Sequence, residues 1–231
     1  MKISLIIPCY NEEKSLPTLF NNLQNLLNNN DVEIIIIENG STDKSLSVIT
    51  SFYEKNKNFK FVSLKKNKGY GYGILQGLKI ANNEYLAWSH ADLQTNPDDI
   101  LEGMKLFDNS EKKIFVKGLR YGRKIEDRIF TVLMSIYASI KLGYLFWDIN
   151  AVPSIFPVTF YEEWEDPPFD FSLELYAYFQ AKKRGYKIKR IPVNFTKRLH
   201  GFSKWNFSLT SKIKFIKRSI KFIGELSKKY K

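Results

Sequence analysis

Cysteine is almost missing from this sequence, which holds only Cys9 among 231 residues. One thiol excludes an intramolecular disulfide and favours a reducing compartment, where Cys9 is expected to be a small buried hydrophobic residue. The sequence also lacks internal repeats, low-complexity blocks beyond an Asn run at 28–30, and a secretory leader before its first apolar run. These absences predict a globular protein of the cytoplasm, and 44% hydrophobic residues suffice for a substantial core.

Acidic residues are scarce toward the C-terminus. Residues 182–231 contain 17 Lys or Arg and one acid, Glu225, whereas the other 181 residues carry 19 basic and 23 acidic groups. This asymmetry predicts an anionic partner, namely nucleic acid, a phosphate-bearing substrate or an acidic membrane. Nucleic acid is not expected, because beyond Trp205 and Phe207 the basic segment shows no stacking platform of aromatic residues interleaved with its basic residues.

Short apolar runs alternate with helical patterns along the first half of the chain. The expected strands cover residues 3–8, 32–38, 61–64, 85–88 and 114–118, and the expected helices cover 16–27, 73–81 and 97–107, the last with Asn96 as its N-cap. Apolar runs without strict alternation are typical of strands buried on both faces. The pattern predicts an α/β fold with a mostly parallel sheet and right-handed crossovers.

Four polar segments follow four of these expected strands. They are "PCYNEE" (8–13), "ENGSTD" (38–43), "KNKGYGYG" (66–73) and "SHADLQ" (89–94). The carboxyl ends of parallel strands meet at one sheet edge, where α/β proteins bind their ligands, so the four segments predict one site. The glycine-rich segment lacks the spacing of a dinucleotide-binding fingerprint. Taken alone, "SHADLQTNP" fits either an ordinary turn or a metal-binding loop.

These segments, in this order, resemble family 2 glycosyltransferases of the GT-A fold, with a Rossmann-like sheet flanked by helices. "LIIPCYNEEKSL", "IIIIENGSTDKS" and "KNKGYGYGILQGL" are similar to the family's opening motifs. "HADLQTNP" resembles a motif of polyprenyl-phosphate sugar synthases such as the dolichyl-phosphate mannose synthases. The likeness continues through "GLRYGRKIEDR", "FDFSLELYAYFQAKKRGYKIKRIPVNF" and "RLHGFSKW", and it covers about residues 3 to 205.

The resemblance implies a pocket for a nucleotide sugar, with a GDP or UDP moiety. Its lining residues would be Pro8, Tyr10, Glu12, Glu38, Gly69, His90 and Ala91. Glu12 would bind the ribose and Glu38 would face the base. Asn39 replaces a second Asp of the family, which leaves the identity of the base open.

The resemblance also implies a divalent cation, Mg²⁺ or Mn²⁺, bound by Asp92 with help from Gln94. Such cations take oxygen ligands and commonly bridge one or two carboxylates to substrate phosphates. His90 stands where the family commonly has Asp. Imidazole is a poor ligand for Mg²⁺ and an acceptable one for Mn²⁺, and His90 could instead contact the ribose or sugar, or simply pack.

An acceptor phosphate would be bound by a group of cationic and polar residues, namely Arg120, Arg123, Arg128, Arg198, Ser203 and Lys204. The expected catalytic residues are Asp92, Arg198, Lys204 and Asp148. The reaction predicted from the resemblance is inverting transfer to a polyprenyl monophosphate. The alternative acceptor is a saccharide hydroxyl, which needs a base, for which Asp148, Glu165 or Asp166 could serve. A remote alternative is a basic binding protein without catalysis.

Two later segments bear on membrane binding. Residues 128–147 are apolar but fall short of about 20 apolar residues, so they predict either a core helix or a helix in the membrane interface. We expect residues 1–208 to form the catalytic domain and residues 209–231 to form a basic amphipathic helix, which either rests on anionic lipid or packs on the core. A peripheral location on the cytoplasmic face of a membrane follows. The sequence predicts no oligomeric state.

Overall fold

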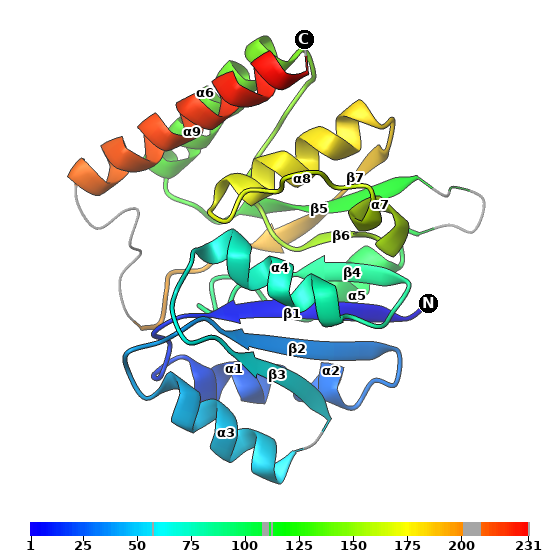
Figure 1. Cartoon of the computed structure of the whole chain (residues 1–231), viewed down its shortest axis with the longest axis vertical. Helices are drawn as coiled ribbons and strands as arrows, with labels where there is room; N and C mark the ends of the chain where they lie inside the picture. The colour runs from blue at the N-terminus through cyan, green and yellow to red at the C-terminus, as the bar shows by residue number, and fades with distance from the viewer. Residues whose placement is uncertain (57, 108–110, 112, 201–208, 231) are drawn as a thin grey trace. The chain divides into compact units, whose positions relative to one another are not determined.

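The computed structural model describes residues 1–231 except 57, 108–110, 112, 201–208 and 231 (Figure 1). The chain divides into two compact units. The first unit comprises Met1–Gly122 and Ala151–His200, and the second comprises Arg123–Asn150 and Gly201–Lys231. The second unit joins a helix of the middle of the chain to the C-terminal helix. The domain boundary expected at residue 208 stays a prediction.

A seven-stranded sheet forms the centre of the first unit, in the order β3-β2-β1-β4-β6-β5-β7. Its strands are β1 (Ile3–Cys9), β2 (Val32–Glu38), β3 (Phe59–Ser63), β4 (Tyr85–Trp88), β5 (Ile114–Tyr121), β6 (Ser154–Pro157) and β7 (Lys187–Asn194). Only β6 runs antiparallel to its neighbours, β4 and β5. The predicted α/β class with a mostly parallel sheet is confirmed.

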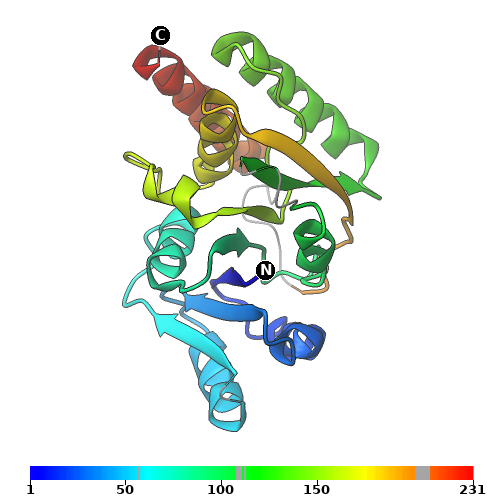
Figure 2. The same ribbon diagram turned by 90° about the vertical axis from the view of Figure 1, so that its right-hand side faces the viewer.

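Helices cover both faces of this sheet, as the turned view shows (Figure 2). They are α1 (Leu16–Asn22), α2 (Gln24–Leu27), α3 (Ser45–Lys55), α4 (Tyr70–Ile80), α5 (Asp99–Met104), α7 (Val158–Glu162) and α8 (Ser172–Lys183). Because both faces are covered, β1 and β2 are almost fully buried along their length. Cys9 is 1% exposed at the end of β1, as expected of a small buried hydrophobic residue.

Three of the predicted helices differ in the structure, either in where they begin or in being divided. The helix expected at 16–27 is divided at Leu23 into α1 and α2. The helix expected from Pro97 begins two residues later, because Asn96 accepts a hydrogen bond from the Asp98 amide in a turn (3.1 Å) and does not cap α5 itself. α4 begins at Tyr70, three residues before the glycine at which the prediction started.

The second unit consists mainly of two long helices, α6 (Ile125–Leu142) and α9 (Leu209–Lys229). They pack on each other: the rings of Phe130 and Phe215 lie 6.3 Å apart, and the Ser227 hydroxyl donates to the Lys141 carbonyl (3.1 Å). α9 buries Phe215, Ile223 and Leu226. Within the described part of the chain, no helix is long and apolar enough to span a bilayer.

Candidate active site

The loops after β1 and β2 are tied together by hydrogen bonds. The Asn39 amide donates to the Cys9 carbonyl (2.8 Å), and the Thr42 amide donates to the Asn11 side chain (2.8 Å). The Glu12 amide donates to the Ser45 hydroxyl at 2.8 Å. This network holds Pro8, at the end of β1, and Tyr10 beside the second loop, so two of the four predicted segments meet at one sheet edge, as expected.

Glu38 ends β2 and is 2% exposed. One of its oxygens accepts a hydrogen bond from the Ser41 amide and the other from the Ser63 hydroxyl (2.8 Å). Its neighbour Asn39 donates to the Gly69 carbonyl (2.9 Å), while no described residue hydrogen-bonds to the buried amide oxygen of Asn39. Both side chains are therefore held in fixed orientations at the edge where the base was predicted.

The glycine-rich loop lies against the backbone of residues 168–170. Gly69 has φ +118°, and a Cβ there would approach the Phe169 carbonyl oxygen to 2.3 Å; a Cβ at Gly71 would approach the Pro168 carbonyl oxygen to 2.6 Å. The Tyr72 amide donates to the Phe169 carbonyl (2.9 Å). Glycine is required here because two backbone segments come into contact, which gives Gly69 a structural role beside the nucleotide-binding role predicted for it.

Asp92 and Glu12 both accept hydrogen bonds from the Arg198 side chain. The Arg198 guanidinium donates to Asp92 through Nη2 (2.7 Å) and to Glu12 through Nη1 (3.3 Å). All three side chains are mostly buried, with exposures of 25% for Arg198, 12% for Glu12 and 8% for Asp92. Burial raises the pKa of Glu12, and the Arg198 guanidinium and the Ser15 hydroxyl act against this shift. The structure thus brings together three predicted site residues from distant parts of the chain.

The Asp92 loop is fastened to the segment that carries Arg198. The Thr196 amide donates to the Gln94 carbonyl (2.9 Å), and the Thr196 hydroxyl donates to the Leu93 carbonyl (3.1 Å). The side-chain amide of Gln94 donates to the Thr196 carbonyl (3.2 Å). Because Gln94 uses its N–H in this bond, its amide oxygen is the atom that it can offer to a cation.

A buried hub that the sequence analysis missed lies next to His90. Glu174, in the first turn of α8, accepts hydrogen bonds from the Tyr70 hydroxyl (2.9 Å), the Trp88 indole (2.6 Å) and the Lys117 ammonium (2.9 Å). Lys117 and Glu174 are 0% and 1% exposed. No local pattern marks either residue, since Glu174 is an acid in the first turn of a helix and Lys117 is a single cation within the strand β5.

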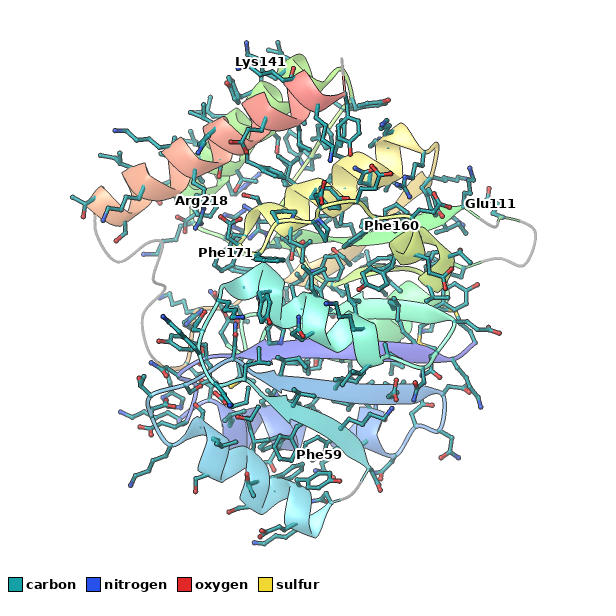
Figure 3. All side chains as sticks on the ribbon, viewed as in Figure 1. Phe59, Glu111, Lys141, Phe160, Phe171 and Arg218 are labelled. Atoms are coloured by element: carbon teal, nitrogen blue, oxygen red, sulfur yellow. The ribbon has the colours of Figure 1, made fainter. Side chains whose placement is uncertain are left out.

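Tyr70 connects this hub to the Asp92 loop. Its ring stacks on Phe171, labelled in Figure 3, with centroids 4.4 Å apart, and lies 5.3 Å from the His90 ring. Burial lowers the pKa of His90, and the nearby charges of Asp92 and Glu174 oppose that shift. The neutral imidazole is therefore favoured beside Asp92. Ala91, the residue between them, is 3% exposed.

The predicted phosphate-binding residues fall into both units. In the first unit, the Arg120 guanidinium lies over the Phe195 ring at 5.2 Å. In the second unit, Arg123 donates to the Thr131 hydroxyl (2.8 Å) and lies 3.6 Å from the Asp148 carboxylate. Arg128 is exposed on α6. Ser203 and Lys204 lie outside the described residues, so their predicted roles have no structural counterpart here.

The chain itself offers few ligands to a metal ion. Among the described residues, no group of three or more His, Cys, Asp or Glu side chains could hold one. Asp92 and the Gln94 amide oxygen fit a cation of the Mg²⁺ or Mn²⁺ type that takes its remaining ligands from water and a bound diphosphate. They do not fit a closed structural metal site, which needs four protein ligands.

A sequence model of the family described as "Glycosyl transferase family 2" matches residues 4–157, which contain β1 from its second residue, the whole of β2 to β6, and the Asp92 loop. The chain belongs to this family. It is therefore a glycosyltransferase, and the predicted GT-A fold is confirmed. The loops that carry Glu12 and Asp92 lie inside the range matched by the family model, whereas Glu174 and Arg198 lie beyond it.

Named relatives differ in what their names say of the acceptor. The chain is 26% identical over 225 residues to the dolichyl-phosphate beta-glucosyltransferase of Dictyostelium discoideum, covering 84% of this chain and 66% of the relative. It is 31% identical over 159 residues to the poly-beta-1,6-N-acetyl-D-glucosamine synthase of Staphylococcus epidermidis, covering 67% of this chain and 38% of the relative. This family 2 glycosyltransferase thus spans about two thirds or less of the relatives' lengths.

A solved structure with the same fold is glucosyl-3-phosphoglycerate synthase from Mycobacterium tuberculosis, in complex with Mn²⁺, uridine diphosphate and glucosyl-3-phosphoglycerate. The TM-score is 0.71 at 14% identity, covering 96% of this chain and 78% of the other. At that identity the likeness shows the fold of the family 2 glycosyltransferase and not its substrates.

Proposed function

We propose that this glycosyltransferase moves a sugar, with inversion, from a GDP- or UDP-sugar to a polyprenyl monophosphate at the surface of an anionic membrane. In this proposal Pro8, Tyr10, Glu12 and Glu38 face the nucleoside, with Gly69, His90 and Ala91 completing the pocket. Asp92 and Gln94 bind Mg²⁺ or Mn²⁺, which neutralises charge on the diphosphate when bound. The relative named for dolichyl phosphate supports the class of acceptor.

The observation that carries the membrane part of the proposal is an apolar row on α6. Five residues at helical spacing are exposed on this helix: Ile125 (67%), Ile129 (56%), Leu133 (60%), Ile136 (48%) and Ile140 (76%). Leu145 and Trp147, just after α6, are 77% and 49% exposed. A continuous exposed apolar row on a soluble surface marks an interaction site, and a helix of this kind can lie in the membrane interface.

Cations accompany the apolar row in the same unit. Exposed basic side chains occupy α9 at Lys212, Lys214, Lys217, Arg218 and Lys221; Lys141 on α6 and Arg218 on α9 are labelled in Figure 3. Basic residues beside apolar ones favour an anionic lipid surface. We therefore include in the proposal that residues 128–147 form an interface helix, and not a core helix.

The acceptor is proposed to be a phosphate because the candidate bases are poorly suited to that role. Asp148 is 5% exposed, and its carboxylate lies 3.6 Å from the Arg123 guanidinium, so this acid already has a cationic partner. Glu165 and Asp166 are exposed to solvent. An ionised phosphate oxygen needs no base, so catalysis would rest on aligning it with the anomeric carbon and on stabilising the leaving diphosphate.

The test is transfer of radiolabelled sugar to undecaprenyl phosphate from a panel of UDP- and GDP-sugars with Mn²⁺. Arg198→Ala should abolish most transfer, since a charge-assisted bond to phosphate is strong. Asp148→Asn, Glu165→Gln and Asp166→Asn should each cost far less. If one acid variant is inactive while Arg198→Ala is nearly normal, the acceptor is a saccharide hydroxyl. That alternative is kept because a relative is named as a polysaccharide synthase.

A further inference from the structure

We propose that Arg198 closes the donor site while it is empty, its guanidinium standing between Glu12 and Asp92 in place of the divalent cation. Binding of a metal-bound nucleoside diphosphate then requires Arg198 to leave Asp92. This inference rests on the proposed assignment of Asp92 to the metal ion. The proposed function places Arg198 at a phosphate, and the inference adds an earlier state in which Arg198 binds Asp92 and Glu12.

The two acids are each left with one oxygen for Arg198. Asp92 accepts the Gln94 amide at Oδ1 (3.1 Å), and its Oδ2 is bound by Arg198 (2.7 Å). Glu12 accepts the Ser15 hydroxyl at Oε2 (2.9 Å), and its Oε1 is bound by Arg198 (3.3 Å). The chain's own short-range donors thus fix one oxygen of each carboxylate, and the remaining pair of oxygens receives one guanidinium.

Charge explains why Glu12 and Asp92 need the Arg198 guanidinium when no metal ion is bound. Glu12 and Asp92 come from different loops and are mostly buried, so without a positive charge between them two poorly solvated carboxylates would repel each other. Arg198 supplies one positive charge with planar donors that reach both acids. A divalent cation at Asp92 would meet the same need, and it would be repelled by a guanidinium on the same carboxylate oxygen.

The backbone around Arg198 shows what has to move. Thr196 is fastened to the Asp92 loop through the Gln94 and Leu93 carbonyls, so the segment two residues before Arg198 is fixed to that loop. The guanidinium can therefore leave by rotation of its own long side chain, with the strand end in place. Once it has left Asp92, the guanidinium is available to bind a phosphate. The donor therefore binds before the acceptor phosphate does.

Mn²⁺ binding without nucleotide tests this proposal directly. Electron paramagnetic resonance titration should show Arg198→Ala binding Mn²⁺ about 10-fold more tightly than the wild type, because the competing cation is gone. Lys197→Ala is the matched control: it removes the same charge from an exposed side chain one residue away. It should change the affinity less than about 2-fold, since an exposed charge is screened by solvent.

Arg198→Lys carries the test if the alanine variant does not fold. Its ammonium is a single point charge that cannot bridge both acids as a guanidinium does, so Mn²⁺ should bind more tightly than in the wild type but less than in Arg198→Ala. Affinity equal to the wild type in Arg198→Lys and Arg198→Ala, or an equal gain in Lys197→Ala, overturns the proposal.

The same titration separates this proposal from the proposed function. Asp92→Asn should lose Mn²⁺ binding; if it does not, the metal assignment is wrong whatever Arg198 does. Tighter Mn²⁺ binding in Arg198→Ala together with normal transfer to undecaprenyl phosphate would retain the closure by Arg198 and reject its role at the acceptor.

Discussion

Two lysine–glutamate pairs of the protein have similar lengths and opposite surroundings. Lys117 and Glu174 are 2.9 Å apart and 0% and 1% exposed, whereas Lys105 and Glu102 are 2.6 Å apart and 68% and 64% exposed. An exposed pair contributes little to stability, because water solvates both ions well when they are apart. A buried pair that loses one partner leaves an uncompensated charge in the core.

Glu174→Gln should therefore lower the free energy of unfolding by about 3–5 kcal/mol. Urea denaturation measures the effect, and Glu102→Gln is the control, expected to stay within about 0.5 kcal/mol of the wild type. The double variant Lys117→Met, Glu174→Gln should lose less than the sum of the single losses, since it leaves no buried ion unpaired. Equal losses of unfolding free energy in Glu174→Gln and Glu102→Gln would show that the buried pair contributes no more to stability than the exposed pair.

Asp99, in the first turn of α5, predicts a pH dependence. Burial raises the pKa of Asp99 to about 6. A carboxyl with a folded-state pKa above its unfolded one holds its proton more tightly when folded, so stability falls as pH rises from about 4 to 6. Asp99→Asn should therefore raise the melting temperature at pH 7 and leave it nearly unchanged at pH 4. A gain of the same size at both pH values would remove titration of Asp99 as the cause.

At the scale of the elements, β1 to β5 were predictable from the sequence as short apolar runs, whereas β6 and β7 were not. β1, β2 and β4 appear in the sequence as apolar runs, because both faces of each are covered. β7 mixes charged and apolar residues, and β6 has only two apolar residues between Ser154 and Pro157, so neither strand stands out as an apolar run. Such strands are held by pairing with their neighbours, which composition does not record.

The same distinction applies to the site. The segments that contain Glu12 and Asp92 were predicted to form one site because the carboxyl ends of parallel strands share one edge, and the resemblance to the family then singled out these two acids. Arg198 contacts them across 186 and 106 positions of sequence, and the geometry of that contact depends on the hydrogen bonds of Thr196. Glu174 reaches Tyr70 over 104 positions through the core. No local pattern encodes such contacts, so the residues of the loops were predictable and their partners were not.

The apolar row of α6 leads to a prediction about this one element. Ile129→Ser combined with Leu133→Ser should weaken binding to anionic vesicles by roughly 10-fold or more, since two half-exposed side chains lose about 1 kcal/mol of transfer free energy each. Both residues are already exposed, so the melting temperature should change little. Ile80→Ser, at a 37% exposed position on α4, is the control and should bind vesicles as the wild type does. Undiminished flotation of the double variant would mean that α6 does not contact lipid.

At the scale of the whole molecule, the formal net charge is +12, and the basic excess is concentrated in residues 182–231. Charge and apolar surface act on a membrane in different ways. Attraction between exposed lysines and anionic lipid is screened as salt rises, while burial of apolar side chains in the interface is not weakened by screening. Vesicle binding should therefore have a salt-sensitive part from the lysines and a salt-insensitive part from the apolar row.

Replacing Lys212, Lys214 and Lys217 of α9 with Gln isolates the first part. Each basic residue near an anionic surface contributes about 1 kcal/mol, so the triple variant should bind vesicles containing phosphatidylserine roughly 100-fold more weakly at low salt. At about 1 M salt the triple variant and the wild type should bind alike, because the screening length is then only about 3 Å. The matched control replaces Lys2, Lys55 and Lys79, which are exposed in the first unit, and removes the same charge. If both triple variants lose the same affinity, the attraction comes from the net charge of the molecule as a whole; if only the α9 variant loses it, α9 itself lies at the lipid surface.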